Sequence, residues 1–455
     1  MTTGPVAESR PRRWRWESLT GGAVILEDDD YRHLWLGRLL SHSALNAVLY
    51  TLLVLAVGEG SGASIKSALF ITAYLLPTAT LGTVSGVIVD RLPKNLVLTG
   101  VNVVRLGLMV VLLMMNTEIW TVYLIALFIA VTSQFSGPAE GAALPLVVKR
   151  DQITRANSTN NFGGLVSQVV GFMVLPPLFL NTVGARPLFF CAAILFGAGA
   201  VFFFSIDRLN DGDTDIGGTV DAVRNVRKQF AEAWERLSRD VSAYMSVIVV
   251  VLASTASLVA VTLMPRFTQD VLDIPTRNAI FVFLPAAVGV VAGLRLVHLL
   301  ERHVEQRWLV GGGFVLLALS FALLAFARPL GNGLEDLNPA GVFDPGPFGA
   351  TSARIVVVVI LSTATAFSYS VVGVASRSLV NHRIPVAIQG RVFAAQSVLS
   401  NLASIPPILL AGVMAEMFDV ATVLLLTVFI LVATAGWALA RALARPQDLS
   451  HAEAN

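Results

Sequence analysis

Twelve long apolar stretches run through this chain, and they constrain its fold more than any other feature. A membrane-spanning helix needs about 20 mostly apolar residues, because the hydrocarbon core is about 30 Å thick. The period-two alternation of barrel strands is missing from these stretches, so helices are expected. The sequence predicts an all-α membrane protein with twelve transmembrane helices in two six-helix halves. The spans lie near 33–57, 67–89, 95–115, 118–138, 158–180, 187–206, 241–264, 278–299, 308–327, 353–375, 391–413 and 420–441.

Composition excludes several other classes of protein. Only 14% of the 455 residues are charged and 55% are hydrophobic, whereas an ordinary soluble domain has about 25% charged residues. The single Cys191 excludes an intrachain disulfide and a cysteine-rich metal site. The segment with Asp211, Asp213 and Asp215 resembles the start of a calcium-binding loop, but it lacks the Gly and the last carboxylate of such a loop. The segment GSGASIKS resembles a phosphate-binding loop but lacks its Gly before the Lys. We therefore predict no metal, no cofactor and no enzymatic activity.

The distribution of basic residues predicts the orientation of the chain. Of the 32 Lys and Arg residues, 23 fall in segments on the same side as the N-terminus, six fall on the other side and three lie within spans. Cytoplasmic loops carry an excess of Lys and Arg. We therefore expect a multi-pass protein of the cell (inner) membrane with both termini in the cytoplasm.

The segments between the spans define the expected domains. The first segment carries arginines with Trp14 and Trp16, which favour an interfacial anchor over contact with nucleic acid. The central connection contains apolar residues at helical spacing, as expected for a helix on the membrane surface. A Pro- and Gly-rich segment, 328–351, predicts an irregular outer loop. The domains are a cytoplasmic segment 1–32, a half 33–206, a cytoplasmic linker 207–240, a half 241–441 and a cytoplasmic tail 442–455.

The loop between the second and third spans carries the most informative motif. Its sequence, Gly86-Val-Ile-Val-Asp90-Arg91-Leu-Pro93-Lys94, is similar to the signature loop of the major facilitator superfamily. The resemblance extends to two six-helix halves, a long central loop and internal termini. Residues 135–157 and 389–412 also resemble the exporter branch that includes enterobactin-type siderophore exporters.

This resemblance implies a cytoplasmic gate between the second and eleventh helices. Gly86 would allow a close approach to a neighbouring helix, and Asp90 would cap an adjacent helix and pair with Arg391. Arg91 and Lys94 complete the basic part of the motif. The alternative is a plain solvated turn.

Polar residues inside the spans are few, so they are candidates for contact with substrate or ions. Arg38 lies near the cytoplasmic end, where its side chain can also extend to the interface. Arg105 lies at the middle of the third span, where a structural pairing and a role in the cavity stay equally open. For the Ser and Thr positions, helix packing is favoured. The candidates are Arg38, His42 and Asn46 on the first span, Arg105 on the third, Gln168 on the fifth, and Gln396 and Asn401 on the eleventh.

Carboxylates are expected only at the ends of spans. Glu59, Asp90, Glu140, Asp207 and Glu416 all lie at such ends by the predicted boundaries, so the fourth span carries neither an acid nor an arginine. A proton-coupled cycle would then need another group that titrates near neutral pH. His42 is the candidate, because an unperturbed imidazole has a pKa near 6.5.

Together these features predict a secondary transporter that exports a small amphipathic organic molecule, drug-like or siderophore-like, by alternating access. Arg105 and His42 slightly favour an anionic substrate. The expected partners are this small molecule, membrane lipid and, for a coupled cycle, protons, with no nucleic acid. A lipid or lysolipid flippase and a non-transporting membrane sensor or scaffold are the alternatives.

Overall fold

A computed structural model describes residues 28–58, 61–115, 118–209, 234–301, 303–336 and 352–443. Within these ranges the secondary structure is helical, and twelve helices are long and apolar enough to cross a membrane. The predicted fold class is therefore confirmed. The predicted N-terminal anchor, most of the amphipathic linker helix, the second part of the outer loop and the last residues of the tail lie outside the described residues.

The N-terminal half contains the first six spans. The fifth span is built from three consecutive pieces, because the chain passes from an α-helix through a π-helix into a second α-helix. The bounds are α2 (Asp29–Val57), α3 (Ala63–Arg91), α4 (Lys94–Met114), α5 (Ile119–Val147), α6 (Ile153–Gln168) with η2 (Val169–Val174) and α7 (Leu175–Thr182), and α8 (Ala185–Phe204).

The C-terminal half contains the other six spans, of which the eighth is also interrupted. The bounds are α10 (Val241–Asp270), η4 (Thr276–Asn278) with α11 (Ala279–Phe283) and α12 (Ala286–Leu300), α13 (Gln306–Ala325), α14 (Ala327–Asp336), α15 (Ser352–Arg383), α16 (Val386–Met417) and α17 (Val420–Leu443). The short α14 does not span the membrane and follows α13 directly.

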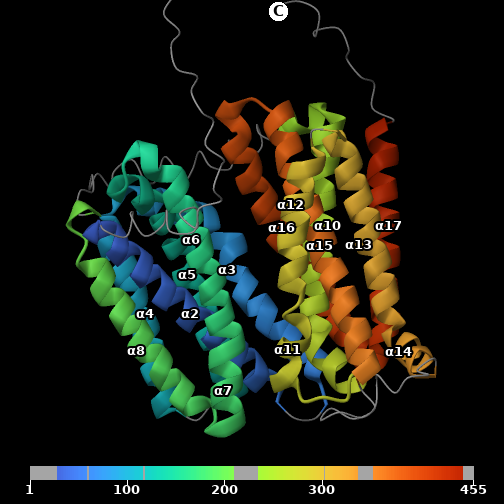
Figure 1. The fold of residues 1–455 in the computed structure, drawn as a ribbon, viewed down its shortest axis with the longest axis horizontal. Helices are drawn as coiled ribbons and strands as arrows, with labels where there is room; N and C mark the ends of the chain where they lie inside the picture. Colours follow the sequence, from blue (N-terminus) through green and yellow to red (C-terminus); the bar gives the residue numbers. More distant parts are fainter. Residues whose placement is uncertain are drawn as a thin grey trace, which may run out of the picture.

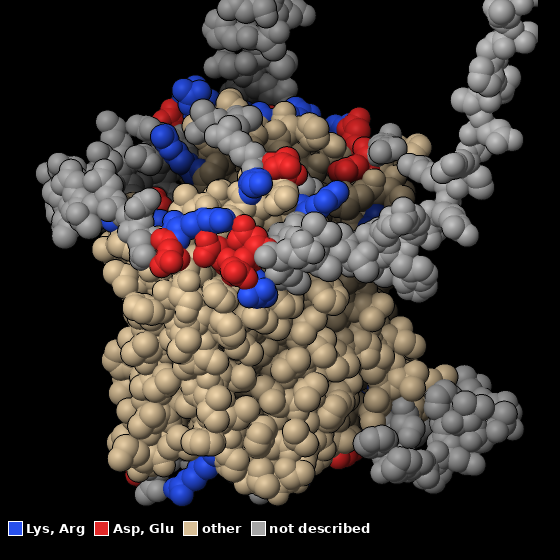
Figure 2. Space-filling model, turned by 60° about the vertical axis from the view of Figure 1, so that its left-hand side comes forward, with Lys and Arg blue, Asp and Glu red and all other residues tan. Residues whose placement is uncertain are grey.

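The two halves stand side by side (Figure 1), and most charged side chains on the face shown in Figure 2 gather at one end of the molecule. Below this end, the face in Figure 2 is a belt with almost no Lys, Arg, Asp or Glu, as expected for a surface in hydrocarbon. We call the upper end in the figures the charged end. It holds the start of α2, the turn between α3 and α4, and the end of α17. The other end is called the opposite end.

Two sequence expectations about helix ends were wrong. The fourth span continues to Val147 rather than stopping near 138, because Pro138 and Pro145 lie inside α5 and do not end it. Prolines are tolerated inside membrane helices when neighbours satisfy the freed backbone groups. The first part of the predicted outer loop is the helix α14, in which Pro329 occupies the first turn, where a missing N–H costs little.

At two positions a glycine is required because the backbone of a neighbouring helix approaches closely. A methyl group at Gly171, in the π-helix η2, would clash with the Ser43 carbonyl oxygen and the Asn46 side chain of α2. A methyl group at Gly289, in α12, would clash with the Thr363 carbonyl oxygen of α15. Lipid tails are as apolar as the helices, so close packing of small residues drives association in place of the hydrophobic effect. These positions therefore fix how helices pack within each half.

A polar contact at the opposite end joins the two halves. The carboxylate of Glu416, near the end of α16, accepts hydrogen bonds from the backbone N–H groups of Gly62 (3.2 Å) and Ser64 (2.9 Å) at the start of α3. Arg266 of α10 pairs with the same carboxylate at 2.7 Å. We call Gly62, Ser64, Arg266 and Glu416 the clasp. A carboxylate at a helix N-terminus is further stabilised by the helix dipole.

Helix packing beside the clasp is equally close. A methyl group at Gly412 of α16 would clash with the Ala68 side chain of α3. Toward the charged end the two groups of helices diverge (Figure 1). The halves are therefore held together at the opposite end and part toward the charged end.

Glu416→Gln should loosen the clasp, because the amide keeps one acceptor but removes the charge that Arg266 needs. A hydrogen bond to a charged group contributes roughly 1.5–3 kcal/mol, so the closed clasp should lose free energy of this order. We expect longer distances between spin labels at Val183 and Met417, which are exposed at the opposite end of the two halves. The labels would be attached in a Cys191→Ser background and measured by double electron–electron resonance.

Asp270→Asn is the matched control for this prediction. Asp270 also pairs with Arg266, at 3.0 Å, but it lies in the same helix and does not reach the N-terminal half. Its distance distribution should match that of the parent protein. Equal distributions for both variants would show that the clasp does not hold the halves together.

Candidate functional site

A buried carboxylate pairs with two basic side chains inside the N-terminal half. Glu140 of α5 lies 3.0 Å from the Arg38 Nε atom and 3.0 Å from the His42 Nε2 atom, both on α2. The side chain of Glu140 is 9% exposed, whereas those of Arg38 and His42 are 33% and 35% exposed. We call Arg38, His42 and Glu140 the buried ion cluster. Its carboxylate is enclosed, and its basic groups remain open on one side.

The buried ion cluster corrects the prediction that acids lie only at the ends of spans. Glu140 stands seven residues before the end of α5, which is about 10 Å along a helix. The fourth span therefore does carry an acid, and the predicted titratable group His42 is bonded to it. Arg38 uses its charge in this cluster, so it does not extend to the interface as a snorkelling side chain.

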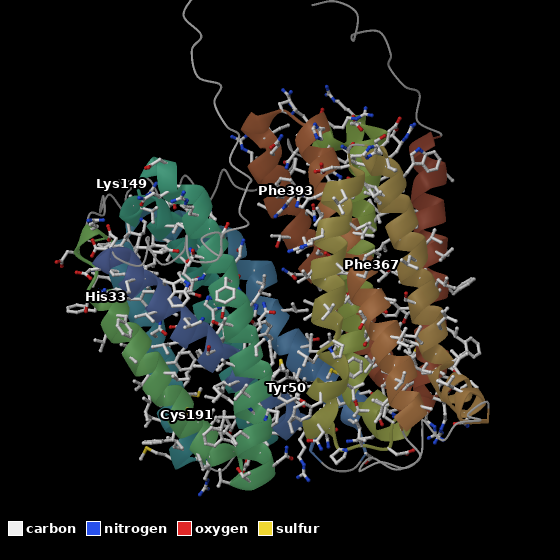
Figure 3. The ribbon with its side chains drawn as sticks, in the orientation of Figure 1. His33, Tyr50, Lys149, Cys191, Phe367 and Phe393 are labelled. Carbon is white, nitrogen blue, oxygen red and sulfur yellow. The ribbon has the colours of Figure 1, made fainter. Side chains whose placement is uncertain are left out.

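The helix that carries Arg38 and His42 reaches the C-terminal half at Tyr50. His42, Asn46 and Tyr50 are four residues apart on α2 and form one stripe that drifts by only about 40° per step. At the end of this stripe, the Tyr50 hydroxyl donates to the carbonyl oxygens of Thr276 (3.2 Å) and Arg277 (3.3 Å) of the other half. Tyr50 lies where the two halves meet in Figure 3. The stripe therefore reaches the boundary between the halves at Tyr50, whereas Asn46 packs within the N-terminal half.

Arg105 makes a structural pairing with α5 in this conformation, and its role in the cavity stays a prediction. Its side chain is 2% exposed and donates from Nε to Thr132 (3.0 Å), and from Nη2 to Ser133 (3.0 Å) and Ser136 (3.3 Å). All three acceptors lie on α5, the helix that carries Glu140. Its guanidinium also lies 5.8 Å from the ring centre of Phe196. Arg105 thus joins α4 to α5 and places a second positive charge near the buried ion cluster.

The other predicted polar residues do not join this cluster. Asn46 donates to the Ser167 carbonyl oxygen at 3.4 Å, and the Ser167 hydroxyl donates to the Leu39 carbonyl oxygen at 3.0 Å, so these residues pack α2 on α6. Gln168 is exposed at the end of α6, and Gln396 and Asn401 are partly buried on α16. In the described part of the chain, no hydrogen bond connects these three side chains to the buried ion cluster. Their role in binding stays a prediction.

An apolar cavity of about 330 Å³ lies between the halves, beyond the buried ion cluster toward the opposite end. Both halves contribute to its wall. Leu49 and Tyr50 lie seven and eight residues after His42 on α2, so the cavity begins about 10 Å farther along this helix. The cavity and the cluster together provide an apolar surface next to a charged one. Its lining residues are Leu49, Tyr50, Leu53, Phe70, Ile71, Tyr74, Leu75, Phe172, Leu258, Val261, Met264 and Ile280.

The predicted gate residues lie at the charged end, where the halves part. Asp90 and Arg391 are exposed, and they do not form an ion pair with each other in the described structure. A methyl group at Gly86 would meet open space, so the close approach expected there is not formed in this conformation. Arg91 is the last residue of α3 and is half-buried. The gate itself stays a prediction.

Lys94 has a local role that its motif did not reveal. Its Nζ donates to the carbonyl oxygens of Val89 (2.8 Å), Asp90 (2.7 Å) and Leu92 (2.9 Å), and the side chain is buried. These carbonyls lie at the end of α3, where the last carbonyls of a helix run short of intrahelical partners; the Val89 carbonyl also accepts from the Leu92 N–H. Lys94 therefore holds the turn between α3 and α4 in a fixed shape.

Sequence reasoning missed several residues of the site. Glu140 was placed outside the fourth span, although the apolar run resumes after it as GAALPLVV. Asn102 was not considered, although it lies three residues before Arg105 on the same helix face. The Ser41 hydroxyl donates to Asn102 at 2.6 Å, and both residues are buried. The sequence did contain a sign of this contact, because Asn102 is a polar residue one helical turn from the buried Arg105.

Comparison with known proteins agrees with this architecture. The profile described as Major Facilitator Superfamily matches residues 34–405. Macrolide efflux protein A of Streptococcus pyogenes is 23% identical over 158 residues, which are 33% of this chain and 39% of that protein. The protein of the same name from Streptococcus pyogenes serotype M6 gives the same values. The chain thus spans about two fifths of the length of these curated relatives.

Solved transporter structures share the fold. A point mutant of the nucleoside transporter NupG has a TM-score of 0.69 at 13% identity, covering 90% of this chain and 99% of that chain. A POT family transporter in complex with a thioalcohol-conjugated peptide has a TM-score of 0.63 at 11% identity, with coverages of 90% and 95%. A bacterial homolog of the human lysosomal transporter Spinster, inward-facing and unoccupied, has a TM-score of 0.62 at 13% identity, with coverages of 91% and 97%. At these identities the likeness shows the fold alone. Because the profile covers most of the chain and twelve spans form two packed halves, this protein belongs to the major facilitator superfamily.

Proposed function

We propose that this secondary transporter exports a small amphipathic organic molecule by alternating access, coupled to proton movement through the buried ion cluster. The observation that carries the proposal is a carboxylate, Glu140, paired with Arg38 and His42 inside a membrane span, in a protein whose described halves are held together by the clasp at the opposite end. Ionisable groups inside a membrane are costly, and they usually mark substrate or proton pathways.

The charged end would face the cytoplasm, because it carries most of the basic side chains. The protein would then be inward-open as described here, with the clasp closing the outer side. Rocking of one half against the other would open the clasp and bring Asp90 toward Arg391. Each end would close with its own charged contact, so that one opening exists at a time.

The substrate would place its apolar part in the 330 Å³ cavity and its polar part toward the buried ion cluster. Arg38, whose side chain is partly exposed, and the buried Arg105 nearby make the surroundings of Glu140 positive, which favours an anionic or strongly polar group on the substrate. The similarity to macrolide efflux protein A supports efflux as the direction and a macrolide as a first compound to test. Drug-like and siderophore-like compounds both have the required amphipathic character.

Substrate export would be coupled to proton movement because a proton competes with Arg38 and His42 for the carboxylate of Glu140. In the conformation described here, Arg38 and His42 pair with the carboxylate of Glu140. A proton taken up at the cluster weakens these ion pairs and frees the basic side chains for other partners. His42 is hydrogen-bonded to Glu140, so it belongs to the proposed proton site together with that carboxylate.

Glu140→Gln should abolish uphill transport while leaving downhill exchange in place. The amide keeps the size of the side chain but cannot ionise, so a pH gradient no longer changes its charge. Proteoliposomes with an acidic lumen and a radiolabelled macrolide would show loss of accumulation, with counterflow retained. His42→Gln and the double variant should behave like the single Glu140 variant, because all three remove the same titrating unit.

Glu118→Gln is the matched control, because Glu118 is exposed at the N-cap position of the same helix. It should accumulate the macrolide like the parent protein. Accumulation by Glu140→Gln at the parent rate would contradict coupling at the cluster. Neither accumulation nor counterflow of any macrolide, siderophore or lysolipid by the parent protein would favour a non-transporting sensor.

Asp90→Asn tests the gate at the charged end. Loss of the charge that would hold Arg391 should destabilise the state closed at this end and leave the protein inward-open for longer. We expect faster labelling of Ser397→Cys, an exposed position on α16, by a membrane-impermeant maleimide applied at the charged end of a Cys191→Ser background.

Asp151→Asn is the control for the gate, since Asp151 is also exposed at the charged end but lies in the turn before α6. It should leave the labelling rate unchanged. If Asp90→Asn also leaves labelling and transport unchanged, the motif is a plain solvated turn.

A further inference from the structure

A second and larger cavity lies in the C-terminal half, outside the transport pathway. Its volume is about 800 Å³, near the upper end of the roughly 300–1,000 Å³ of ligand pockets. Helices α10, α13 and α17 form its walls, and Leu379 of α15 contributes from behind. In Figure 1, α13 and α17 lie on the side of the molecule away from the N-terminal half. The cavity is therefore separate from the candidate functional site.

This cavity opens on the outer surface of the helix bundle. Val315 of α13 is 67% exposed and Val432 of α17 is 53% exposed, and both line the cavity. The side chains around the opening are apolar, so it faces hydrocarbon rather than water. A water molecule needs two to four polar partners, which this wall does not offer over most of its length. An apolar occupant from the membrane fits these surroundings.

The depth of the cavity matches one leaflet of the bilayer. Along α13 the lining runs from Arg307 to Ala318, which is eleven residues or about 16 Å of helix. One leaflet contributes half of the hydrocarbon thickness of about 30 Å, which is about 15 Å. The cavity thus begins at the charged end and reaches the middle of the membrane, the span of one lipid acyl chain.

The rim of the cavity offers a partner for a phosphate group. Arg307 lies in the first turn of α13 and is 57% exposed, with its Nε 2.6 Å from Glu305 and its guanidinium 5.7 Å from the Trp308 ring centre. In the described structure its terminal nitrogens have no protein acceptor. Guanidinium groups bind phosphates through two parallel hydrogen bonds. Trp308, at 67% exposed, and Trp437, at 62% exposed, are typical of the headgroup level.

We propose that the cavity between α10, α13 and α17 binds one glycerophospholipid of the leaflet at the charged end. One acyl chain fills the cavity from Arg307 to Ala318, and the phosphate group is bound by Arg307 at the rim. The site is occupied from the membrane and does not lie on the transport pathway. The lipid would support the packing of α17, which is peripheral, on α10 and α13.

Two neighbouring glycines allow a sharp test. A methyl group added at Gly311 or at Gly312 would meet open space, so a side chain can begin at either position without a clash. Gly311 lines the cavity and Gly312 does not. Gly311→Leu should therefore fill the cavity, and Gly312→Leu is its matched control on the same helix. Gly436→Leu fills the cavity from α17 and keeps the test valid if the first variant does not fold.

The full-length protein would be reconstituted in palmitoyl-oleoyl phosphatidylglycerol, extracted in mild detergent and weighed by native mass spectrometry. The parent protein and Gly312→Leu should retain one phospholipid. Retention by Gly311→Leu and Gly436→Leu should fall about tenfold, because the added side chain displaces at least two buried methylenes. Arg307→Gln should lower retention as well, through loss of the phosphate partner.

A phosphatidylglycerol with a diazirine near the end of one acyl chain would locate the bound lipid. Labelled peptides should come from α13 and α17 in the parent protein, and this labelling should disappear in Gly311→Leu. Equal retention by Gly311→Leu and Gly312→Leu, or labelling confined to α3 and α16, would overturn the proposal. Neither measurement depends on transport, so both stand apart from the proposed function.

Discussion

The hydrocarbon core offers no hydrogen-bond partner, and every polar group of this protein that enters it must find one within the protein. For the backbone, this requirement leaves helices as the solution, even where prolines such as Pro77 and Pro138 remove a donor. For side chains, it drives hydroxyl groups back onto the carbonyl of the preceding turn, as at Thr262 and Thr365. The few groups that a helix cannot satisfy alone therefore determine which helices must meet.

Arg105 and Glu140 are such groups, and they organise the N-terminal half. Arg105 uses three hydroxyl groups of α5, so α4 and α5 must pack at one register. Glu140 uses two basic side chains of α2, so α5 and α2 must pack as well. A buried ion pair adds little net stability, because desolvation offsets the attraction between the charges. These charges therefore determine which helices pack together rather than add much to the stability of the fold.

The contacts between the two halves are unequal at the two ends. The clasp combines a carboxylate, two backbone donors and an arginine, whereas the charged ends of α3 and α16 stand apart with Asp90 and Arg391 exposed. The alternating access proposed above needs this arrangement, in which a contact of moderate strength closes one end while charged groups stay available at the other. A single strong contact between the halves would fix one conformation and prevent exchange.

The sequence by itself determined the number of spans, the helical fold and the place of Arg38, His42 and Arg105 within the spans. These properties are local, because about 20 apolar residues in a row must form a helix whatever surrounds them. It also identified the turn with Asp90, although not the local role of Lys94, whose bonds depend on how that turn folds.

Only the tertiary structure decided which polar residues meet. His42 and Glu140 are 98 positions apart, and Glu140 became part of a site only because α5 continues past Pro138 and packs on α2. Both cavities and the clasp likewise join segments that are distant in the sequence. In a membrane, the faces of a helix that contact lipid and those that contact protein are equally apolar, so hydrophobicity does not indicate its neighbours. The neighbours of each helix are instead determined by close packing at positions such as Gly171 and Gly289 and by the pairing of buried charges.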